Sequence, residues 1–234
     1  MRVIIDNFGF FMLGQFPKGP LGGLALTILL GIYTGISAFC VGIVVASLSV
    51  VPIAPLRWLG RGFVMLIRCV PSLVFLFWMY FMLPRLLRTE LSGMQTACLA
   101  LTLYHGAYMA EDIRGGILAV ASGQWEAARS TGLNGVQTFR FVVMPQAIRA
   151  IVPALINRFV NLFMYTSIVA LIGIFDLMYA AIAVNNRDLI YPLQIFGFVG
   201  AVYFVFCYGI TKIGRILERR WDWAPRIKTF TAAV

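Results

Sequence analysis

The chain has 234 residues, 61% of them hydrophobic, and a formal net charge of +10. A soluble globular domain holds about 45–50% apolar residues, so this composition excludes an ordinary soluble enzyme. The net positive charge alone could indicate nucleic-acid binding. The charges are segregated, however, and none occurs between Lys18 and Arg57. Such long uncharged stretches are typical of a membrane protein, and we expect no nucleic-acid partner.

Uncharged segments along the chain predict five membrane-spanning helices. Each segment reaches or approaches the roughly 20 residues that cross about 30 Å of hydrocarbon as a helix. Helices are expected because lipid offers no hydrogen-bond partner for an unpaired backbone. We therefore predict an all-α membrane protein with five transmembrane helices. The predicted spans are 21–50, 62–83, 94–113, 147–175 and 192–214.

The basic residues predict the orientation of these spans. Five spans put the two termini on opposite sides, and a cytoplasmic C-terminus places twelve Arg and Lys residues inside and five outside. Cytoplasmic loops carry such an excess in membrane proteins, so the N-terminus is expected outside. The predicted organisation is an external leader at 1–20, a membrane domain at 21–217 and a basic cytoplasmic tail at 218–234, with Trp221 and Trp223 at the membrane interface.

The longest connection between spans, residues 114–145, is polar and lies on the inner side. Ser122 is placed to cap a first short helix, and Gly132 to end it in a left-handed conformation. Asn134 and Gln137 have the spacing of a capping box for a second helix. Three aromatic residues supply expected apolar anchors: Trp125, Phe139 and Phe141. The pattern fits a compact docking surface or an ordinary structured loop.

The residues needed for catalysis are not arranged in any motif. The sequence holds no GxxxxGK[ST] phosphate-binding loop, so nucleotide binding of that kind is not expected. Four scattered cysteines are interpreted as small apolar packing residues: Cys40, Cys69, Cys98 and Cys207. We expect no catalytic residue and no metal site, and the chain is predicted not to be an enzyme.

Several motifs resemble one family of transport proteins. The inner loop reads Glu126-Ala127-Ala128-Arg129, followed by Gly132 and then Pro145. Other matching blocks are Phe63 to Pro71, Tyr80-Phe81-Met82-Leu83-Pro84, Gly106-Ala107-Tyr108-Met109-Ala110-Glu111 and Arg114-Gly115-Gly116-Ile117. Together they are similar to the polar amino-acid ABC importer permeases of the histidine, glutamate and glutamine type, which carry an EAA coupling loop. The resemblance runs from about residue 20 to 215.

The resemblance implies a permease subunit that moves a polar amino acid into the cytoplasm. The implied partners are an ABC ATPase homodimer, a second permease subunit of the same or a homologous chain, an extracytoplasmic amino-acid-binding protein and the bilayer of a bacterial inner membrane. It implies no cofactor in this chain, since ATP and Mg²⁺ would bind the partner ATPase. The implied ATPase-coupling residues are Glu126, Ala127, Ala128, Arg129, Gly132 and Pro145.

Candidate residues of the substrate path lie within the predicted spans: His105, Tyr108, Arg158, Tyr165, Thr166 and Ser167. Arg158 can attract a substrate carboxylate or pair with another protein group, because an unpaired charge in a membrane is costly. His105 can line the path or pack inside the bundle. The hydroxyl groups can bind an amino acid or bridge helices. Glu111 and Asp112, near Arg114, are expected to form an ion pair or a gate.

Two other functions remain open at this point. One is an ATP-independent secondary transporter that uses His105 and Arg158. The other is a structural permease subunit in a heterodimer that makes little substrate contact, because the chain has Met164-Tyr165 where the resembled family often has Lys-Asp.

Overall fold

The computed structural model describes residues 2–220, which contain no β-strand. The all-α prediction is thereby confirmed for this part of the chain. The helices are α1 (Arg2–Asp6), α2 (Phe8–Leu13), α3 (Gly23–Val50), α4 (Ala54–Arg68), α5 (Ser72–Phe81), α6 (Leu83–Leu87), α7 (Gly93–Leu118), α8 (Ser122–Ser130), α9 (Gly135–Thr138), the π-helix η1 (Phe139–Val143), α10 (Met144–Tyr165), the 3₁₀-helix η2 (Thr166–Ile172), α11 (Leu177–Asp188) and α12 (Pro192–Arg220).

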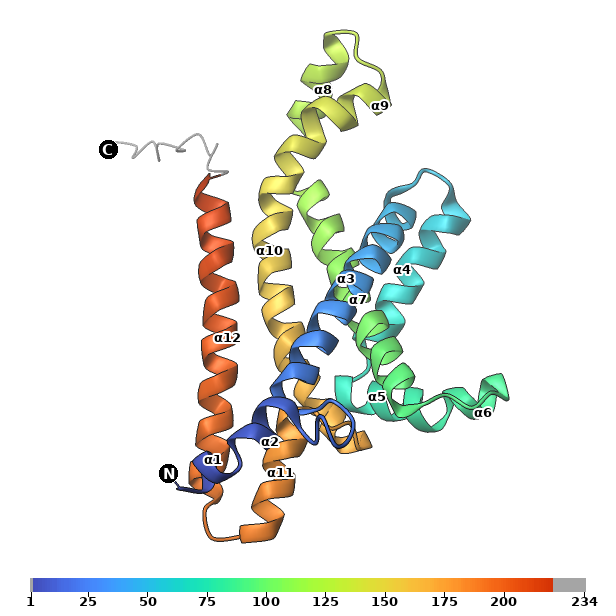
Figure 1. Cartoon of the computed structure of the whole chain (residues 1–234). Helices are drawn as coiled ribbons and strands as arrows, with labels where there is room; N and C mark the ends of the chain where they lie inside the picture. Colours follow the sequence, from blue (N-terminus) through green and yellow to red (C-terminus); the bar gives the residue numbers. More distant parts are fainter. Residues whose placement is uncertain (1, 221–234) are drawn as a thin grey trace, which may run out of the picture.

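The centre of the fold is the crossing of α3 and α7 (Figure 1). Two glycines allow their backbones to approach closely. A Cβ at Gly42 would lie 2.8 Å from the Cβ of Met109, and a Cβ at Gly106 would lie 2.8 Å from a methyl of Val41. Small residues of this kind are how membrane helices gain van der Waals contact. Because α4, α5 and α10 also contact α7, this helix is surrounded by protein.

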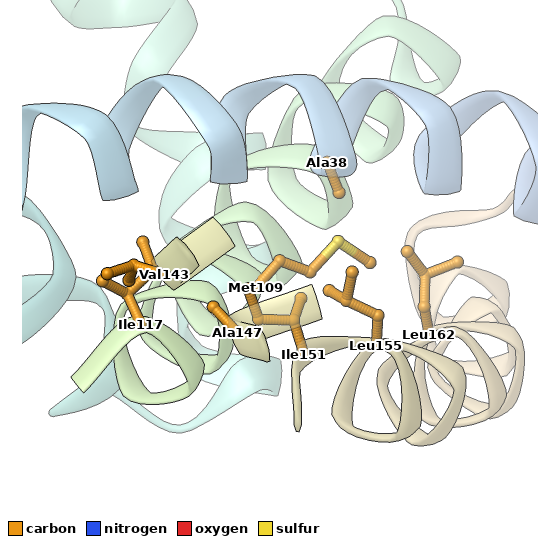
Figure 2. Close-up of a cluster of buried hydrophobic side chains, with 8 residues drawn as sticks. All are labelled: Ala38, Met109, Ile117, Val143, Ala147, Ile151, Leu155 and Leu162. Atoms are coloured by element: carbon orange, nitrogen blue, oxygen red, sulfur yellow. The ribbon is translucent and has the colours of Figure 1, made fainter. Parts of the chain in front are cut away.

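A second packing layer joins α10 to the crossing helices. Eight buried apolar side chains form it, namely Ala38, Met109, Ile117, Val143, Ala147, Ile151, Leu155 and Leu162. Figure 2 shows Ala38 of α3 above the others. Met109 and Ile117 come from α7, Val143 from η1, and Ala147, Ile151, Leu155 and Leu162 follow along α10. The layer reaches from the middle of the bundle to the base of the α8–α9 loop. It therefore gives that loop a continuous apolar connection to the central helices.

Three helical stretches in residues 2–220 are long and apolar enough to cross a membrane singly: Gly23–Val50, Gly135–Ile172 and Pro192–Glu218. They correspond to the first, fourth and fifth predicted spans. The third predicted span is α7, which is less apolar but enclosed by other helices, an environment that tolerates polar groups in a membrane. The total of five crossings stays a prediction.

The second predicted span, 62–83, differs from the structure. Its first helix already begins at Ala54, and the helix pair Ala54–Arg68 and Ser72–Leu87 is bent by 103°. Pro71 is the cause of the break, because proline lacks a backbone N–H and the residue before it disfavours helix. α4 and α5 therefore form a corner, and both of its arms contact α7.

The two ends of the bundle are built from different parts of the chain. The α8–α9 loop projects at one end, where the C-terminal end of α12 also lies (Figure 1). α1, α2 and α11 lie at the other end, and Phe11 of α2 is fully buried there against α11 and α12. Residues 221–234 of the predicted basic tail, with Trp221 and Trp223, lie outside the described residues.

Candidate translocation path and coupling surface

The inner loop folds as two short helices joined at a glycine. Gly132 has φ +87°, and its N–H donates to the carbonyl of Arg129 while Leu133 N–H donates to Ala128. This is the Schellman end of a helix, which requires a left-handed residue. Asn134 and Gln137 form the predicted reciprocal capping box, with both hydrogen bonds at 2.9 Å.

The predicted cap at Ser122 is wrong. α8 begins at Ser122 itself, the preceding Ala121 occupies the N-cap position, and no side chain caps the helix. The extended backbone of Ala121, with φ −56° and ψ 138°, ends the turn after α7 one residue earlier than the polar pattern indicated. Serine is favoured at an N-cap only when its backbone is extended there, and Ser122 is already helical.

Aromatic packing holds the loop to the bundle. The rings of Trp125 and Phe139 lie 6.4 Å apart, and both pack against the layer of Figure 2. Gln146 of α10 also donates to the side chain of Gln124 in α8 at 3.2 Å. Phe141, in contrast, is 62% exposed, so its predicted role as an anchor is wrong. The guanidinium of Arg140 lies 5.6 Å from its ring.

The predicted coupling residues differ in how far their side chains are exposed to solvent. Ala128 is buried, whereas the other five lie on the surface of the loop, namely Glu126, Ala127, Arg129, Gly132 and Pro145. Val136 is 76% exposed beside them, and the sequence pattern gave no signal for it. The loop therefore presents charged and apolar side chains on a short, rigid projection.

Within the bundle, three tyrosines and the histidine form one cluster. His105 lies 5.5 Å from Tyr104 and 5.3 Å from Tyr165, measured between ring centroids. Tyr104 also lies 5.1 Å from Tyr108, and their hydroxyl oxygens are 3.4 Å apart. The structure thus brings His105, Tyr108 and Tyr165 together around Tyr104. Sequence reasoning missed Tyr104 as a member, although its four-residue spacing from Tyr108 places both on one helix face.

His105 is the polar centre of this cluster. Its side chain is almost fully buried, and within residues 2–220 neither ring nitrogen has a hydrogen-bond partner. A buried polar group without a hydrogen-bond partner lowers the stability of the fold, so such groups are rare in native structures. The cavity beside it measures only about 10 Å³, which is room for about one water molecule. In this conformation the cluster is closed to any amino acid.

An ion-pair layer lies next to the cluster on the side of the inner loop. Arg158 of α10 donates to both carboxylate oxygens of Asp112 in α7, at 2.9 and 3.2 Å. Arg114 donates from Nε to Glu111 at 3.0 Å, and Arg68 Nη1 lies 3.8 Å from the same carboxylate. The predicted ion pair of Glu111 is present. Asp112 pairs across 46 residues of sequence instead, which local spacing does not reveal.

Tyr108 connects the ion pairs to the aromatic cluster. The guanidinium carbon of Arg158 lies 4.6 Å from its ring centroid, and that of Arg68 lies 5.1 Å away. Cations over an aromatic face are attracted by the ring quadrupole. Thr166 and Ser167, the other two path candidates, lie at the start of η2 and donate their hydroxyls to carbonyls at the end of α10, those of Phe163 and Met164. Neither residue lines the small cavity beside His105.

The loop, α10 and the polar cluster have the arrangement of a membrane transport component. Among residues 2–220, no group of three or more His, Cys, Asp or Glu side chains gathers as metal ligands would. The site consists of the projecting α8–α9 loop, the helix α10 that packs against the bundle, and a closed polar cluster between helices. These are parts that move or admit a solute.

Comparison with known proteins agrees with this class. Residues 38–223 match the family model described as "Binding-protein-dependent transport system inner membrane component". The chain belongs to this family. It is 35% identical over 222 residues to the "Probable glutamine ABC transporter permease protein GlnM" of Bacillus subtilis, covering 95% of this chain and 98% of that one. It is 33% identical over 201 residues to the "L-cystine transport system permease protein TcyB" of the same organism, covering 86% of each chain.

A solved structure shares the fold. It is described as "Crystal structure of an amino acid ABC transporter with histidines", and it matches with a TM-score of 0.79 and 31% identity over 85% of this chain and 92% of that chain. The chain is accordingly a membrane permease component of an ABC transport system. It is not the catalytic subunit, and ATPase activity belongs to a separate chain.

Proposed function

We propose that the chain is the permease subunit of an ATP-driven importer that moves a polar amino acid into the cytoplasm, coupled to its ATPase through the 126–145 loop. The observation that carries the proposal is this projecting loop, with Glu126 and Arg129 exposed on α8 and Ala128 buried between them in the sequence. The amino-acid substrate is supported by the relatives, which are named as permeases for glutamine and cystine.

The loop transmits motion because it is continuous with α10. Val143 and Ala147, at the start of that helix, are fully buried in the layer of Figure 2. A displacement of the loop by the ATPase therefore moves α10 as a rigid element against α7. Rigid shifts of packed elements are how such transitions are made, since packed interfaces switch between discrete arrangements. ATP and Mg²⁺ act in the partner ATPase, and this chain contributes no cofactor.

The solute path runs through the closed cluster of His105, Tyr108, Tyr165 and Arg158, and Thr166 and Ser167 follow Tyr165 in the chain at the start of η2. Opening it requires that α10 and α7 separate where Arg158 meets Asp112. The unpartnered nitrogens of His105 then become available to a polar solute. This supports a polar amino acid, which offers both donors and acceptors, over an apolar solute.

The proposed assembly contains an ATPase homodimer, a second permease subunit and an extracytoplasmic amino-acid-binding protein. In the bacterial cytoplasmic membrane the N-terminus lies outside and the C-terminus inside. The excess of basic residues near the loop and on α12 supports this orientation. So does the position of the C-terminal end of α12 at the same end of the bundle as the α8–α9 loop, since the loop must face the cytoplasm to meet the ATPase (Figure 1).

Purification of the tagged chain from its native membrane tests the proposal. We expect mass spectrometry to find a stoichiometric P-loop ATPase, and also to show whether a second permease is present. Glu126→Lys reverses charge on the exposed loop, so it should release the ATPase or uncouple hydrolysis from uptake. Glu90→Lys is the matched control, because Glu90 is exposed in the α6–α7 connection, away from the inner loop. Normal uptake and a normal complex in Glu126→Lys would refute the coupling role.

The ATP-independent transporter that the sequence left open does not agree with the family, because the matching model describes a binding-protein-dependent transport component and the relative GlnM is named as an ABC transporter permease.

A further inference from the structure

Asp176 is a fully buried acid that lies outside both the coupling loop and the closed cluster. It is the N-cap of α11, and its Oδ1 accepts a hydrogen bond from the N–H of Tyr179 at 2.8 Å. Its other carboxylate oxygen, Oδ2, is buried and has no hydrogen-bond partner among the described residues. No ion pair of Asp176 occurs among the side chains that the structure describes. The proposed function gives this acid no role.

Hydrogen bonds to the first turns of α3 fix the position of Asp176. Gly23 N–H donates to the carbonyl of Phe175 at 2.8 Å. Leu177 N–H donates to Oγ1 of Thr27 at 3.0 Å, across 150 residues of sequence. These bonds hold the residues on both sides of Asp176, so its carboxyl group stays inside the bundle.

A second unpaired oxygen lies next to this carboxyl group. The hydroxyl of Tyr203, on α12, interacts with Asp176. Thr27 and Thr166 also border that hydroxyl. Tyr203 Oη is nevertheless buried without a hydrogen-bond partner among the described residues. Both threonine hydroxyls donate to backbone carbonyls instead, at 3.1 and 2.7 Å.

The number of available protons shows what these four side chains lack. Both threonine protons are already used, so Tyr203 has the one free proton and faces three oxygens that can accept it. A proton on Asp176 supplies a second donor, because the acid can then donate to Tyr203 while Tyr203 donates to a threonine oxygen. Without that proton, the buried carboxylate has no positive side chain to balance its charge, which is costly inside a protein.

The elements packed on α11 add no positive charge near Asp176. Tyr203 is the titratable group that faces it from α12, α3 and η2 contribute the two uncharged threonines, and α2 contributes the ring of Phe11. Arg187, in the last turn of α11, packs on Phe10 instead. Burial raises the pKa of the Asp176 carboxyl to about 7, although the N–H groups of the first turn of α11 act in the opposite direction.

We propose that Asp176 is a proton-binding site and that its bound proton joins α11 to α12 through Tyr203. The site lies at the start of α11, at the end of the bundle opposite the α8–α9 loop (Figure 1). When the proton leaves, an unbalanced buried charge remains and the contact between the two helices weakens. The inference stands apart from the proposed function, because no step of it involves the ATPase.

The direction of the pH effect follows from the two pKa values of Asp176. An unfolded aspartate has a pKa of about 3.9, whereas the folded chain raises that pKa to about 7. The folded state therefore binds the proton more tightly. The stability that this proton contributes is complete below about pH 4 and is lost as the pH rises through about 7. Asp176→Asn keeps the shape of the acid and a donor group, so it should remove this dependence.

Infrared spectroscopy of the purified full-length chain in detergent tests the inference. A protonated carboxylic acid has a C=O band that is distinct from the bands of a carboxylate and shifts in heavy water. We expect this band in wild type at about pH 6 and its loss by about pH 8. Asp176→Asn should lack the band. Tyr203→Phe should keep it at higher frequency, since the acid then has no acceptor. Asp6→Asn is the matched control, because Asp6 is exposed on α1, and it should keep the wild-type band.

Thermal unfolding gives a second measurement. Between about pH 6 and about pH 8, the folding equilibrium constant of wild type relative to Asp176→Asn should fall about tenfold. Absence of the band from wild type at both pH values would overturn the inference, and so would an identical band in Asp176→Asn. A stability ratio that does not change with pH would also contradict it. If sodium chloride, but not choline chloride, stabilised wild type alone at the higher pH, the site would bind a metal cation and not a proton.

Discussion

The pair between Arg158 and Asp112 ties α10 to α7, and removing one partner is the sharpest test of how the helices are held. Arg158→Met keeps an apolar stem of similar length but leaves the carboxylate of Asp112 alone. Asp112→Asn does the converse. Each single substitution strands a charge inside the bundle, where it has little water to replace its partner. We expect both variants to be destabilised, with α10 loosened from α7.

The magnitude follows from the geometry. Arg158 makes two hydrogen bonds to Asp112, at 2.9 and 3.2 Å, and the two side chains are 22% and 18% exposed. Stranding one member of a fully buried pair costs about 3–5 kcal/mol, whereas an exposed pair contributes about 0–1 kcal/mol. Because the side chains of this pair are only about one-fifth exposed, the free-energy cost of removing one partner should lie near the value for a buried pair. We expect about 3 kcal/mol for each single variant and a coupling energy of about 2 kcal/mol in a double-mutant cycle.

Thermal unfolding of the purified chain in detergent measures these values, and uptake in cells measures the consequence for transport. The charge swap Arg158→Asp with Asp112→Arg rebuilds the pair in reverse. We expect it to recover most of the stability and most of the uptake. A coupling energy below about 0.5 kcal/mol would refute the structural role. Recovered stability with uptake still lost would show instead that Arg158 meets the solute.

Three further substitutions test other parts of the fold. Gly42→Ala brings a Cβ to 2.8 Å from Met109 and should lower the melting temperature, at a cost of about 1–3 kcal/mol, whereas Gly62→Ala meets nothing within 4 Å and should leave it unchanged or raised. Asn134→Ala removes the capping box and about 1 kcal/mol of loop stability, which faster proteolysis of the loop would reveal. His105→Phe removes two unpaired nitrogens, so it should raise the melting temperature while uptake falls.

The parts of the molecule that sequence could predict are those set by local hydrogen bonding. Gly132 and the Asn134–Gln137 box were both predicted, because their partners lie within a few residues and demand particular residue types. The predicted spans 21–50 and 192–214 correspond to α3 and the first three-quarters of α12. They too depend on local sequence, because lipid requires an apolar segment whose backbone is hydrogen-bonded within one helix.

Features that depend on the packing of distant segments could not be predicted. The acid that meets Arg158 lies 46 residues away, and nothing in the sequence ranks Asp112 above Glu111 as its partner. Arg61 and Arg68 of α4 meet Glu111 and Arg114 of α7 around a cavity of about 550 Å³, an arrangement that arises only when the two helices are assembled. Pro71 predicts that the helix breaks there, but it does not predict the angle between the two helices.

The arrangement joins the loop and the path in a single element. α10 begins at the coupling loop, is buried along the layer of Figure 2, and carries Arg158 beyond its middle. A displacement at one end of a packed helix is passed along its length, and an ion pair with fixed directions opposes that motion more than apolar contacts, which have no preferred direction. The bond between Arg158 and Asp112 is therefore where a loop displacement meets resistance. Tyr108 packs on that guanidinium and on Arg68, so a shift of α10 reaches the closed cluster and the cavity together.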